Sequence, residues 1–225
     1  MIKFAAIKQY ENVLEYPQGM LGKWKAYFEK LSLGEFPISL DNLEISANNS
    51  PQNNTAIKPL VLELACGRGE YAVGLARLFP EQNFLGLDIK GNRIWKGASI
   101  ANKEFIKNVA FVRTQIEQSI QYFAKEEVAE IWITFPDPQI KYKRTKHRMT
   151  NPEFLKKYKK ILKPKGVVHL KTDSEYMHGY TLGLLQGLDL KIEYAHHDVY
   201  GTSNAPKEVT EIQTYYESQY APRCT

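Results

Sequence analysis

The most constraining feature of this 225-residue chain is an apolar run that ends in a glycine turn. Leu60 to Leu64 is apolar enough for a buried parallel strand, and the turn Gly67-Arg-Gly69 follows it closely. Helical periodicity then runs from Glu70 to Phe79, and a second apolar run beginning at Phe84 ends at the acid Asp88. This order of strand, glycine turn, helix, strand and acid predicts a nucleotide-binding unit at one edge of an α/β sheet.

The glycines and the acid of this unit each have a chemical use. Glycine at positions 67 and 69 lets the backbone approach a ligand without a collision from a Cβ atom. An acid at the end of the second strand, here Asp88, can accept hydrogen bonds from both hydroxyls of an adenosine ribose. Gly67, Gly69 and Asp88 are therefore candidate cofactor-binding residues.

Two classes of ligand fit the unit, a dinucleotide and S-adenosylmethionine. The run Gly67-Arg-Gly69-Glu-Tyr-Ala72 satisfies the looser G-x-G-x-x-A pattern of dinucleotide-binding proteins. A nicotinamide-dependent oxidoreductase is therefore an alternative function. Glu63 inside the strand and Glu70 at the helix start would instead repel a pyrophosphate. A carboxylate at position 63 suits the ammonium and sulfonium groups of S-adenosylmethionine better. The alternative role for Glu63 is that of a buried acid bonded to local amides.

Positive charge is concentrated in one segment of the chain. The whole chain carries 30 Lys and Arg against 25 Asp and Glu, a formal net charge of +5. Eleven of the basic residues and a single acid, Glu153, lie between positions 141 and 165, so the rest of the chain is net acidic. A basic block on an acidic body is typical of a protein that binds a polyanion, most often nucleic acid. The lysines of this block after Glu153 fit the solvent face of a helix equally well.

Cysteine content and hydropathy indicate the cellular compartment of the protein. Cys66 and Cys224 are too few and too far apart for a disulfide framework or a metal site, so we expect a reducing compartment and no metal. No run reaches the roughly 20 apolar residues of a membrane span, and the first ten residues lack the apolar core of a signal peptide. We therefore expect a soluble cytoplasmic protein without a membrane partner; monomer and homodimer both stay open.

The order of the predicted elements indicates an α/β fold with a doubly wound, mostly parallel sheet. Residues 1–55 are predicted to form an arm with a short helix over 22–31 and a flexible polar linker over 46–55, followed by the main domain over 56–225. Beyond Asp88 the pattern predicts helices over 92–106, 116–124, 152–162 and 174–188, and strands over 109–113, 130–135, 166–172, 190–195 and 212–216.

The segment after the predicted strand 130–135 holds an acid between two prolines, Pro136-Asp137-Pro138. Open α/β sheets bind ligands at the carboxyl ends of their strands, where this acid would lie. The prolines fix the backbone, so the carboxylate would be oriented before any ligand binds. Asp137 is thus a candidate functional acid; the alternative is a turn in which it only bonds nearby amides.

A dense basic run follows Asp137. Its charges are too close together for a packed helix, and it lies beside the expected cofactor edge, which predicts a loop that contacts phosphates. A solvated surface run without a ligand is the alternative. The residues expected to contact RNA are Lys143, Arg144, Thr145, Lys146, His147 and Arg148.

Taken together, these motifs resemble those of the bacterial tRNA (guanine-N7-)-methyltransferases over nearly the whole chain. The motifs that carry the resemblance are Asn12-Val-Leu-Glu-Tyr-Pro17, Gly22-Lys-Trp24, Glu63 to Gly69, Phe135-Pro-Asp-Pro138 with its basic tail, Lys171-Thr-Asp173 and Thr214-Tyr-Tyr-Glu217. The Phe-Pro-Asp-Pro motif with its tail is highly specific, whereas the glycine turn is shared by many methyltransferases. The resemblance implies a class I, Rossmann-like, S-adenosylmethionine-dependent fold. It also implies methyl transfer to N7 of a tRNA guanine, expected in the variable loop.

The resemblance implies roles for individual residues as well. Asp137 corresponds to the family's proposed catalytic residue. Contacts with S-adenosylmethionine are implied for Glu63, Asp88, Gln115 and Asp137, and contacts with the substrate guanosine for Lys141, Asp173, Thr214 and Glu217.

The chain departs from the family pattern at two positions. Gln115 stands where Asp or Asn is more usual, and Gln139 stands where many members have tryptophan. An amide at position 115 can still bond the edge of an adenine, whereas a stacking role at position 139 is lost. Two alternatives stay open: a catalytically inactive RNA-binding protein on the same fold, and, for Asp173, a simple cap on the following helix.

Overall fold

The computed structural model describes residues 6–45 and 58–220, and its centre is a six-stranded parallel sheet. The strands are β1 (Val13–Glu15), β2 (Leu60–Leu64), β3 (Asn83–Asp88), β4 (Val109–Arg113), β5 (Val128–Thr134) and β6 (Leu162–Lys171). Their order across the sheet is β1-β4-β3-β2-β5-β6, and all neighbours are parallel. The chain turns from one side of β2 to the other between β4 and β5. The carboxyl ends of β2 and β5 therefore flank the switch point where open α/β sheets bind ligands.

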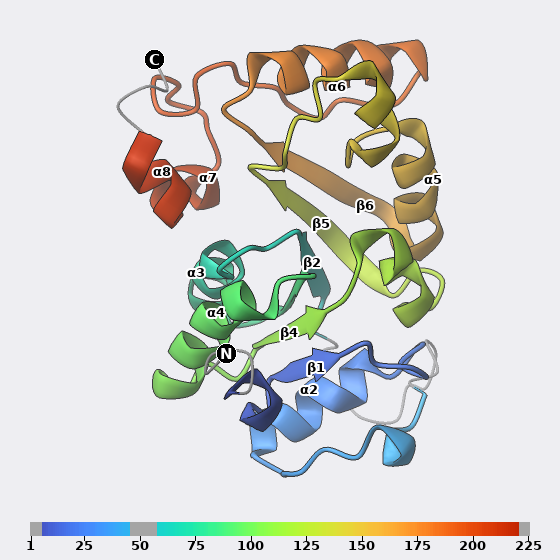
Figure 1. The fold of residues 1–225 in the computed structure, drawn as a ribbon, viewed down its shortest axis with the longest axis vertical. Helices are drawn as coiled ribbons and strands as arrows, with labels where there is room; N and C mark the ends of the chain where they lie inside the picture. Colours follow the sequence, from blue (N-terminus) through green and yellow to red (C-terminus); the bar gives the residue numbers. More distant parts are fainter. Residues whose placement is uncertain (1–5, 46–57, 221–225) are drawn as a thin grey trace.

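Helices connect the strands and cover both faces of the sheet (Figure 1). The α-helices are α2 (Trp24–Leu33), α3 (Glu70–Leu78), α4 (Gly91–Lys103), α5 (Pro152–Ile161), α6 (Glu175–Gly187), α7 (Lys207–Glu211) and α8 (Tyr215–Tyr220). The 3-10 helices are η1 (Ile7–Gln9), η2 (Leu40–Asn42), η3 (Ile116–Tyr122) and η4 (Tyr142–His147). One apolar cluster lies between the sheet and α2 and α5, and a second between the sheet and α3 and α4, so the predicted doubly wound fold is confirmed. Within the described ranges, none of the helices is long and apolar enough to cross a bilayer.

The N-terminal segment contributes to the same sheet. β1 pairs with β4, and α2 buries Trp24, Tyr27 and Phe28 in one of the two apolar clusters. The indole of Trp24 donates a hydrogen bond to the carbonyl of Tyr122 at 2.8 Å. Sequence patterning predicted this helix but missed β1, whose three residues are too few to show a period. The predicted domain boundary and the polar linker fall on residues outside the described ranges.

Two predicted strands and one predicted helix differ in type from the structure, and the strand predicted over 166–172 begins earlier, at Leu162. The strand expected over 190–195 is wrong: this segment passes β6 without strand pairing, and Tyr194 is held by a side-chain bond of 2.7 Å to His169. The strand expected over 212–216 is also wrong, because the chain starts α8 there. The helix expected over 116–124 is the shorter 3-10 helix η3, where the hydroxyl of Ser119 bonds a main-chain carbonyl and competes with regular α-helical pairing.

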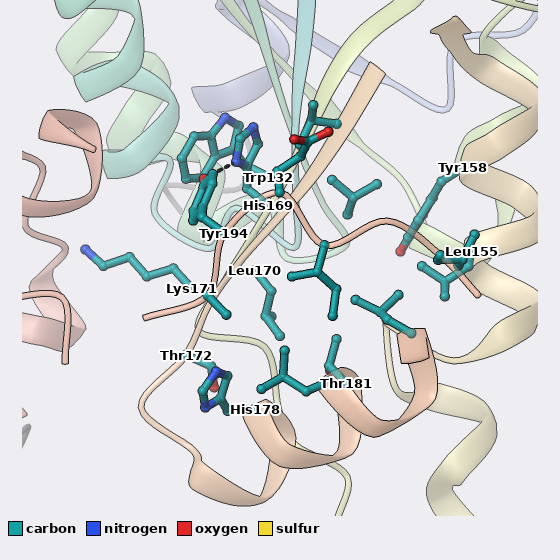
Figure 2. Close-up of a pocket in the computed structure, with 18 of the residues that line it drawn as sticks. Trp132, Leu155, Tyr158, His169, Leu170, Lys171, Thr172, His178, Thr181 and Tyr194 are labelled. Carbon is teal, nitrogen blue, oxygen red and sulfur yellow. Dashed lines mark hydrogen bonds between the residues drawn. The ribbon is translucent and has the colours of Figure 1, made fainter. Parts of the chain in front are cut away.

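The outer edge of the sheet, at β6, is packed less tightly than the centre. All of β2 is buried, whereas most of β6 is only partly buried, and α6 buries only Met177 and Thr181. Side chains from β6, α5, α6 and the segment 188–200 surround a hollow of about 1490 Å³ (Figure 2). The rings of Trp132 and His169 stack at this edge, with their centres 4.0 Å apart. The β6 edge of the molecule is therefore more open than its centre.

Candidate cofactor and substrate site

The glycine turn between β2 and α3 lies at the switch point of the sheet. Gly67 and Gly69 have φ angles of 55° and 69°, in the left-handed region that favours glycine. A Cβ atom on Gly69 would collide with the ring of Phe111 on β4, whereas a Cβ atom on Gly67 would meet nothing within 4 Å. Gly69 is therefore required by packing, and Gly67 borders open space in which a ligand can approach the backbone.

Asp88, at the end of β3, holds the glycine turn in place. One carboxylate oxygen accepts a bond from the N–H of Gly67 at 3.0 Å, and the other accepts from the N–H of Lys90 at 2.7 Å. The residue is only 6% exposed. Because each carboxylate oxygen can accept more than one hydrogen bond, Asp88 retains the capacity to bind ribose hydroxyls.

Glu63 lies in β2 and is buried. One oxygen accepts from the N–H of Ala72 at 2.8 Å, and the other accepts from the hydroxyl of Thr134 at 2.7 Å. Burial raises the pKa of the Glu63 carboxyl to about 8, even though these two bonds act to lower it. The interpretation as a buried acid with local partners accounts for these contacts, and contact with a cationic ligand stays a prediction. A cation brought close to Glu63 would favour the ionised form of the carboxyl.

The Phe-Pro-Asp-Pro loop follows β5 at the same edge of the sheet. Phe135 and Gln139 have φ angles of 46° and 47°, so the backbone is in an uncommon conformation on both sides of Asp137. The Asp137 carboxylate accepts a bond from the N–H of Gln139 at 2.9 Å and is otherwise exposed. The turn interpretation accounts for this bond. The exposed carboxylate is also what a functional acid would require.

Gln115 follows β4 and is exposed at the start of η3. The preceding residue, Thr114, donates its N–H to the carbonyl of Asp88 at 3.0 Å, which keeps the ends of β3 and β4 together. The predicted cofactor residues thus come from the ends of four neighbouring strands or from the β2 strand itself. The structure brings these strand ends to one edge of the sheet.

The basic run after Asp137 forms the short 3-10 helix η4 and its flanks, instead of an irregular loop. Thr145 is partly buried and donates its hydroxyl to the carbonyl of Tyr142 at 2.7 Å, and His147 lies 3.6 Å from Glu117. The exposed cations of the run are Lys141, Lys143, Arg144 and Lys146. These four side chains form a positive surface directly after the Asp137 loop.

Arg148 differs from the other basic residues of the run, because it is only 4% exposed. Its guanidinium donates to the carbonyls of Gln139 at 3.2 Å and Ile140 at 3.3 Å, and it lies 4.5 Å from the ring centre of Tyr180 on α6. The structure does not support the expected RNA contact of Arg148, because its charge is used inside the protein. Arg148 instead holds the Asp137 loop in place.

Asp173 lies just after β6 and is exposed. Its carboxylate accepts a bond from the hydroxyl of Tyr216 at 2.9 Å, and the Tyr216 ring lies 5.4 Å from the ring of Phe135. The capping alternative for Asp173 is wrong: Ser174 caps α6, since its hydroxyl accepts from the N–H of Met177 at 3.2 Å. Asp173 is therefore available at the surface beside the Asp137 loop.

Thr214 and Glu217 begin α8 as a capping box. The carboxylate of Glu217 accepts from the N–H of Thr214 at 2.9 Å, and the hydroxyl of Thr214 accepts from the N–H of Glu217 at 3.2 Å. Glu217 is buried and forms an ion pair of 2.5 Å with Lys171, so groups of this chain engage both of its oxygens. Sequence reasoning missed Lys171 and Tyr216 as neighbours of the site, although both stand inside the motifs Lys171-Thr-Asp173 and Thr214-Tyr-Tyr-Glu217. In the part of the chain described here, no group of three or more His, Cys, Asp or Glu side chains is arranged to hold a metal ion.

Comparisons with known proteins agree with this arrangement. A family model described as "Putative methyltransferase" matches residues 57–222. The chain is 65% identical over 162 residues to a tRNA (guanine-N(7)-)-methyltransferase of Christiangramia forsetii, which covers 72% of each chain. It is 42% identical over 229 residues to a protein of the same name from Bacteroides thetaiotaomicron, which covers 98% of this chain and 80% of the relative.

Among solved structures, the 16S rRNA methyltransferase KamB aligns with a TM-score of 0.51 at 15% identity, over 74% of this chain and 82% of KamB. An antibiotic-related methyltransferase aligns with a TM-score of 0.50 at 17% identity, over 73% of this chain and 81% of that chain. At such low identity these likenesses concern the fold alone, and with the sheet described above they show a class I, Rossmann-like methyltransferase fold. The match of the family model and the identity to relatives along most of the chain show that it belongs to the tRNA (guanine-N(7)-)-methyltransferase family.

Proposed function

We propose that this protein transfers the methyl group of S-adenosylmethionine to N7 of a guanine in the variable loop of tRNA, in the cytoplasm. The observation that carries the proposal is the convergence of two surfaces at one sheet edge. The glycine turn with its acids lies at the ends of β2 and β3, and the Asp137 loop with the cations of η4 follows the adjacent strand β5. The names of the relatives support the substrate, and the family supports the methyl donor.

The residues at the glycine turn fit S-adenosylmethionine, which when bound supplies a methyl group on a positively charged sulfur. The open space beside Gly67 allows the backbone to approach the ligand. Asp88 would accept the ribose hydroxyls, and the Gln115 amide would bond the adenine edge. Glu63, whose pKa is raised to about 8, would ionise in response to the ammonium or sulfonium charge nearby.

The transfer itself needs placement more than acid or base chemistry. Guanine N7 carries a lone pair and no proton, so the chain does not have to remove a proton from the attacking atom. Asp137 would lie next to the purine as it becomes positively charged and would stabilise that charge. Lys141 and Thr214 would help to hold the guanosine. Asp173 would accept from the N1 and N2 hydrogens of guanine, which adenine cannot provide.

The polynucleotide would be held by the exposed cations Lys143, Arg144 and Lys146 through its phosphates. The target base would have to leave its stack to reach Asp137, as in other enzymes that act on a base. A nicotinamide-dependent oxidoreductase would explain the glycine turn, but it would explain neither the basic run nor the relatives. An inactive RNA-binding protein is the competing proposal that only an activity measurement can remove.

The test is nucleoside analysis of unmodified tRNA after incubation with the protein and S-adenosylmethionine. We expect 7-methylguanosine by mass spectrometry, confined to the fragment that contains the variable loop. Asp137→Asn keeps an acceptor for the N–H of Gln139 but removes the charge, and we expect a loss of turnover of about 100-fold with unchanged tRNA affinity. Asp41→Asn, a change at an exposed acid on η2, is the matched control. Binding of both S-adenosylmethionine and tRNA without any 7-methylguanosine would favour the inactive RNA-binding protein.

A further inference from the structure

We infer that Lys171 is a positioning residue for the substrate half of the site, and that Glu217 acts through it. In this inference Glu217 docks the C-terminal segment 200–217 onto the sheet and does not contact guanine itself. The inference rests on the proposed function. It replaces the direct guanine contact expected for Glu217 with a contact inside the protein.

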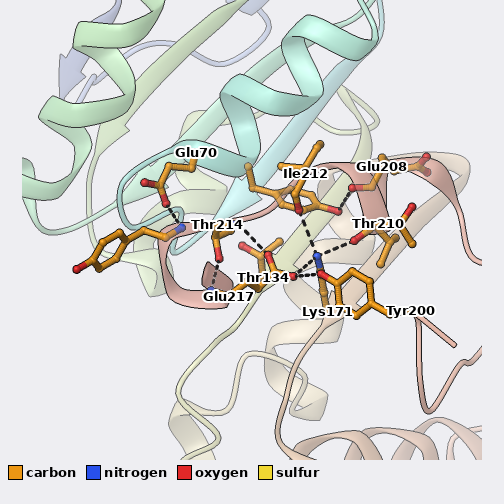
Figure 3. A network of polar contacts seen from close by, with 12 residues as sticks. Glu70, Thr134, Lys171, Tyr200, Glu208, Thr210, Ile212, Thr214 and Glu217 are labelled. Atoms are coloured by element: carbon orange, nitrogen blue, oxygen red, sulfur yellow. Dashed lines mark hydrogen bonds and ion pairs between the residues drawn. The ribbon is translucent and has the colours of Figure 1, made fainter. Parts of the chain in front are cut away.

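The first observation is a buried ion pair at the carboxyl end of β6. The Nζ atom of Lys171 lies 2.5 Å from a carboxylate oxygen of Glu217, and the two residues are 6% and 3% exposed. Lys171 also donates to the main-chain carbonyls of Val209 at 2.7 Å and Ile212 at 3.4 Å (Figure 3). Charged side chains are almost never buried to this extent unless they are paired. One ammonium group therefore holds the C-terminal segment at three points.

The second observation is the aromatic surrounding of this ammonium group. The ring centres of Tyr71, Phe135 and Tyr200 lie 5.4, 5.5 and 5.9 Å from Nζ of Lys171. Ring faces attract a cation and keep water away from it. These rings come from α3, from the loop that carries Asp137 and from the C-terminal segment. Lys171 thus joins the cofactor side, the Asp137 loop and the substrate side.

The docked segment carries two tyrosines that contact other parts of the site. Tyr216 reaches Asp173 at 2.9 Å, and the N–H of Tyr215 donates to the carboxylate of Glu70 at 2.7 Å at the start of α3. Tyr216 is next to Glu217 in the chain, and Tyr215 lies two residues before it. Release of Glu217 from Lys171 would therefore move the groups that border Asp173 and would widen the substrate half of the site.

The contacts of Glu217 argue against a direct role in binding guanine. One oxygen accepts from Lys171 and from the hydroxyl of Tyr200 at 2.7 Å, and the other accepts from the N–H of Thr214 at 2.9 Å. The oxygen that meets Lys171 and Tyr200 already has two donors, and Glu217 is only 3% exposed, so a guanine edge could reach the carboxylate only if the surrounding groups moved. Breaking a buried ion pair leaves an uncompensated charge in the interior, which is strongly unfavourable.

The decisive experiment compares Lys171→Met with the double variant Lys171→Met/Glu217→Gln. The single variant leaves a buried carboxylate without its cation, so we expect the KM for tRNA to rise at least about tenfold while S-adenosylmethionine affinity stays within about threefold. In the double variant no charge is left behind; the amide oxygen introduced at position 217 can accept from the N–H of Thr214, and the amide NH2 group can donate to the hydroxyl oxygen of Tyr200. We expect the KM for tRNA to return to within about fivefold of the unmodified protein. The matched control is the exposed pair Lys30–Glu35, 3.3 Å apart, changed by Lys30→Met alone and with Glu35→Gln, where neither variant should change the KM.

A direct guanine contact by Glu217 predicts the opposite pattern. Glu217→Gln alone would then be nearly inactive, and the double variant would show no recovery over Lys171→Met; this result overturns the inference. Tyr200→Phe removes one bond to Glu217 without a change of charge and serves if Lys171→Met does not fold, with an expected rise in KM of about threefold. An unchanged KM in that variant would count against the docking role.

A measurement that does not depend on enzyme activity can test the docking role of Lys171 separately from the proposed function. Hydrogen exchange of the amides in 208–217 should speed up in Lys171→Met and return towards normal in the double variant. If the unmodified protein makes no 7-methylguanosine, the proposed function fails, yet this exchange pattern still reports whether Lys171 docks the segment. Equal exchange rates in all three proteins would overturn the docking role directly.

Discussion

The proposed cofactor half of the site is built from buried strands and close packing, whereas the proposed substrate half is held together by polar bonds between segments far apart in the chain. In the cofactor half, a Cβ atom on Gly69, Gly86 or Gly97 would collide with the ring of Phe111. In the substrate half, Asp173 meets Tyr216 across 43 residues of sequence. The difference indicates that a fixed pocket suits a small ligand, while a folded polynucleotide requires an accessible and adjustable surface.

We expect the largest loss of stability from a change in the tightly packed cofactor half, Gly69→Ala. The new Cβ atom would meet the Phe111 ring, and the positive φ would strain the backbone, so we expect the free energy of unfolding to fall by about 3 kcal/mol. Urea denaturation followed by circular dichroism measures this change. Gly67→Ala is the matched control, because it has a positive φ but open space around it, and we expect a loss of about 1 kcal/mol together with weaker cofactor binding. Equal losses in the two variants would show that packing against Phe111 does not distinguish the two glycines.

The sequence predicted the structure of the cofactor half more completely than that of the substrate half. The run Leu60 to Leu64, the glycine turn and Asp88 all lie where their pattern placed them, because hydrophobic burial and backbone sterics act locally. The bonds of Glu63 to Thr134 and of Lys171 to Glu217 were not predictable in this way. Each of them joins strands or segments whose contact depends on the order of the sheet, which no local pattern specifies.

The C-terminal segment shows both a missed signal and a real limit. The run from Ile212 to Tyr216 resembles a strand by composition, but Thr214-Tyr-Tyr-Glu217 has the spacing of a capping box, and this signal predicts the start of α8. The burial of Arg148 had no such signal, because its partner ring belongs to Tyr180, on a helix 32 residues further along the chain. Charge density alone therefore overestimated the number of cations available to RNA.

The exposed cations of η4 should contribute to RNA binding and not to stability. Changing Lys143, Arg144 and Lys146 together to Gln should weaken tRNA binding about 30-fold and lower the slope of log affinity against log salt by about 2 to 3, since each lost phosphate contact lowers it by about 1. Binding measured by filter retention at several salt concentrations tests this, and S-adenosylmethionine affinity and stability should not change. The matched control alters the same number of charges on α5, at the exposed residues Lys156, Lys159 and Lys160. An equal loss in the control would mean that the whole basic segment acts as one diffuse field, and that η4 has no special place in it.

The third prediction concerns Glu63, which connects the two halves of the site through its bonds to α3 and to the end of β5. Its pKa is raised from 4.5 to about 8 in the folded protein, so between these pH values the folded chain holds a proton that the unfolded chain has lost. The contribution of Glu63 to stability is therefore complete below pH 4.5 and is lost as the pH rises to about 8. Glu63→Gln should remove this slope, because the amide oxygen can accept from the N–H of Ala72 and the amide NH2 group can donate to the hydroxyl oxygen of Thr134. Thermal unfolding of the two proteins at about pH 5, 6.5 and 8.5 would show the difference as a gain in relative stability of the variant towards high pH.

Cofactor binding should respond to the same proton with the opposite sign. A cationic ligand favours the ionised carboxylate, so the affinity of the unmodified protein for S-adenosylmethionine should rise as the pH approaches the pKa of Glu63, about 8, and then level off. Glu63→Gln should bind about tenfold more weakly at about pH 8.5, a difference typical of one lost charge-assisted contact, and its affinity should lack the rise. Calorimetric titration at three pH values measures both effects. The same rise in the variant would assign the proton to another group, and Glu63 would then belong wholly to the packed half as a buried acid with local partners.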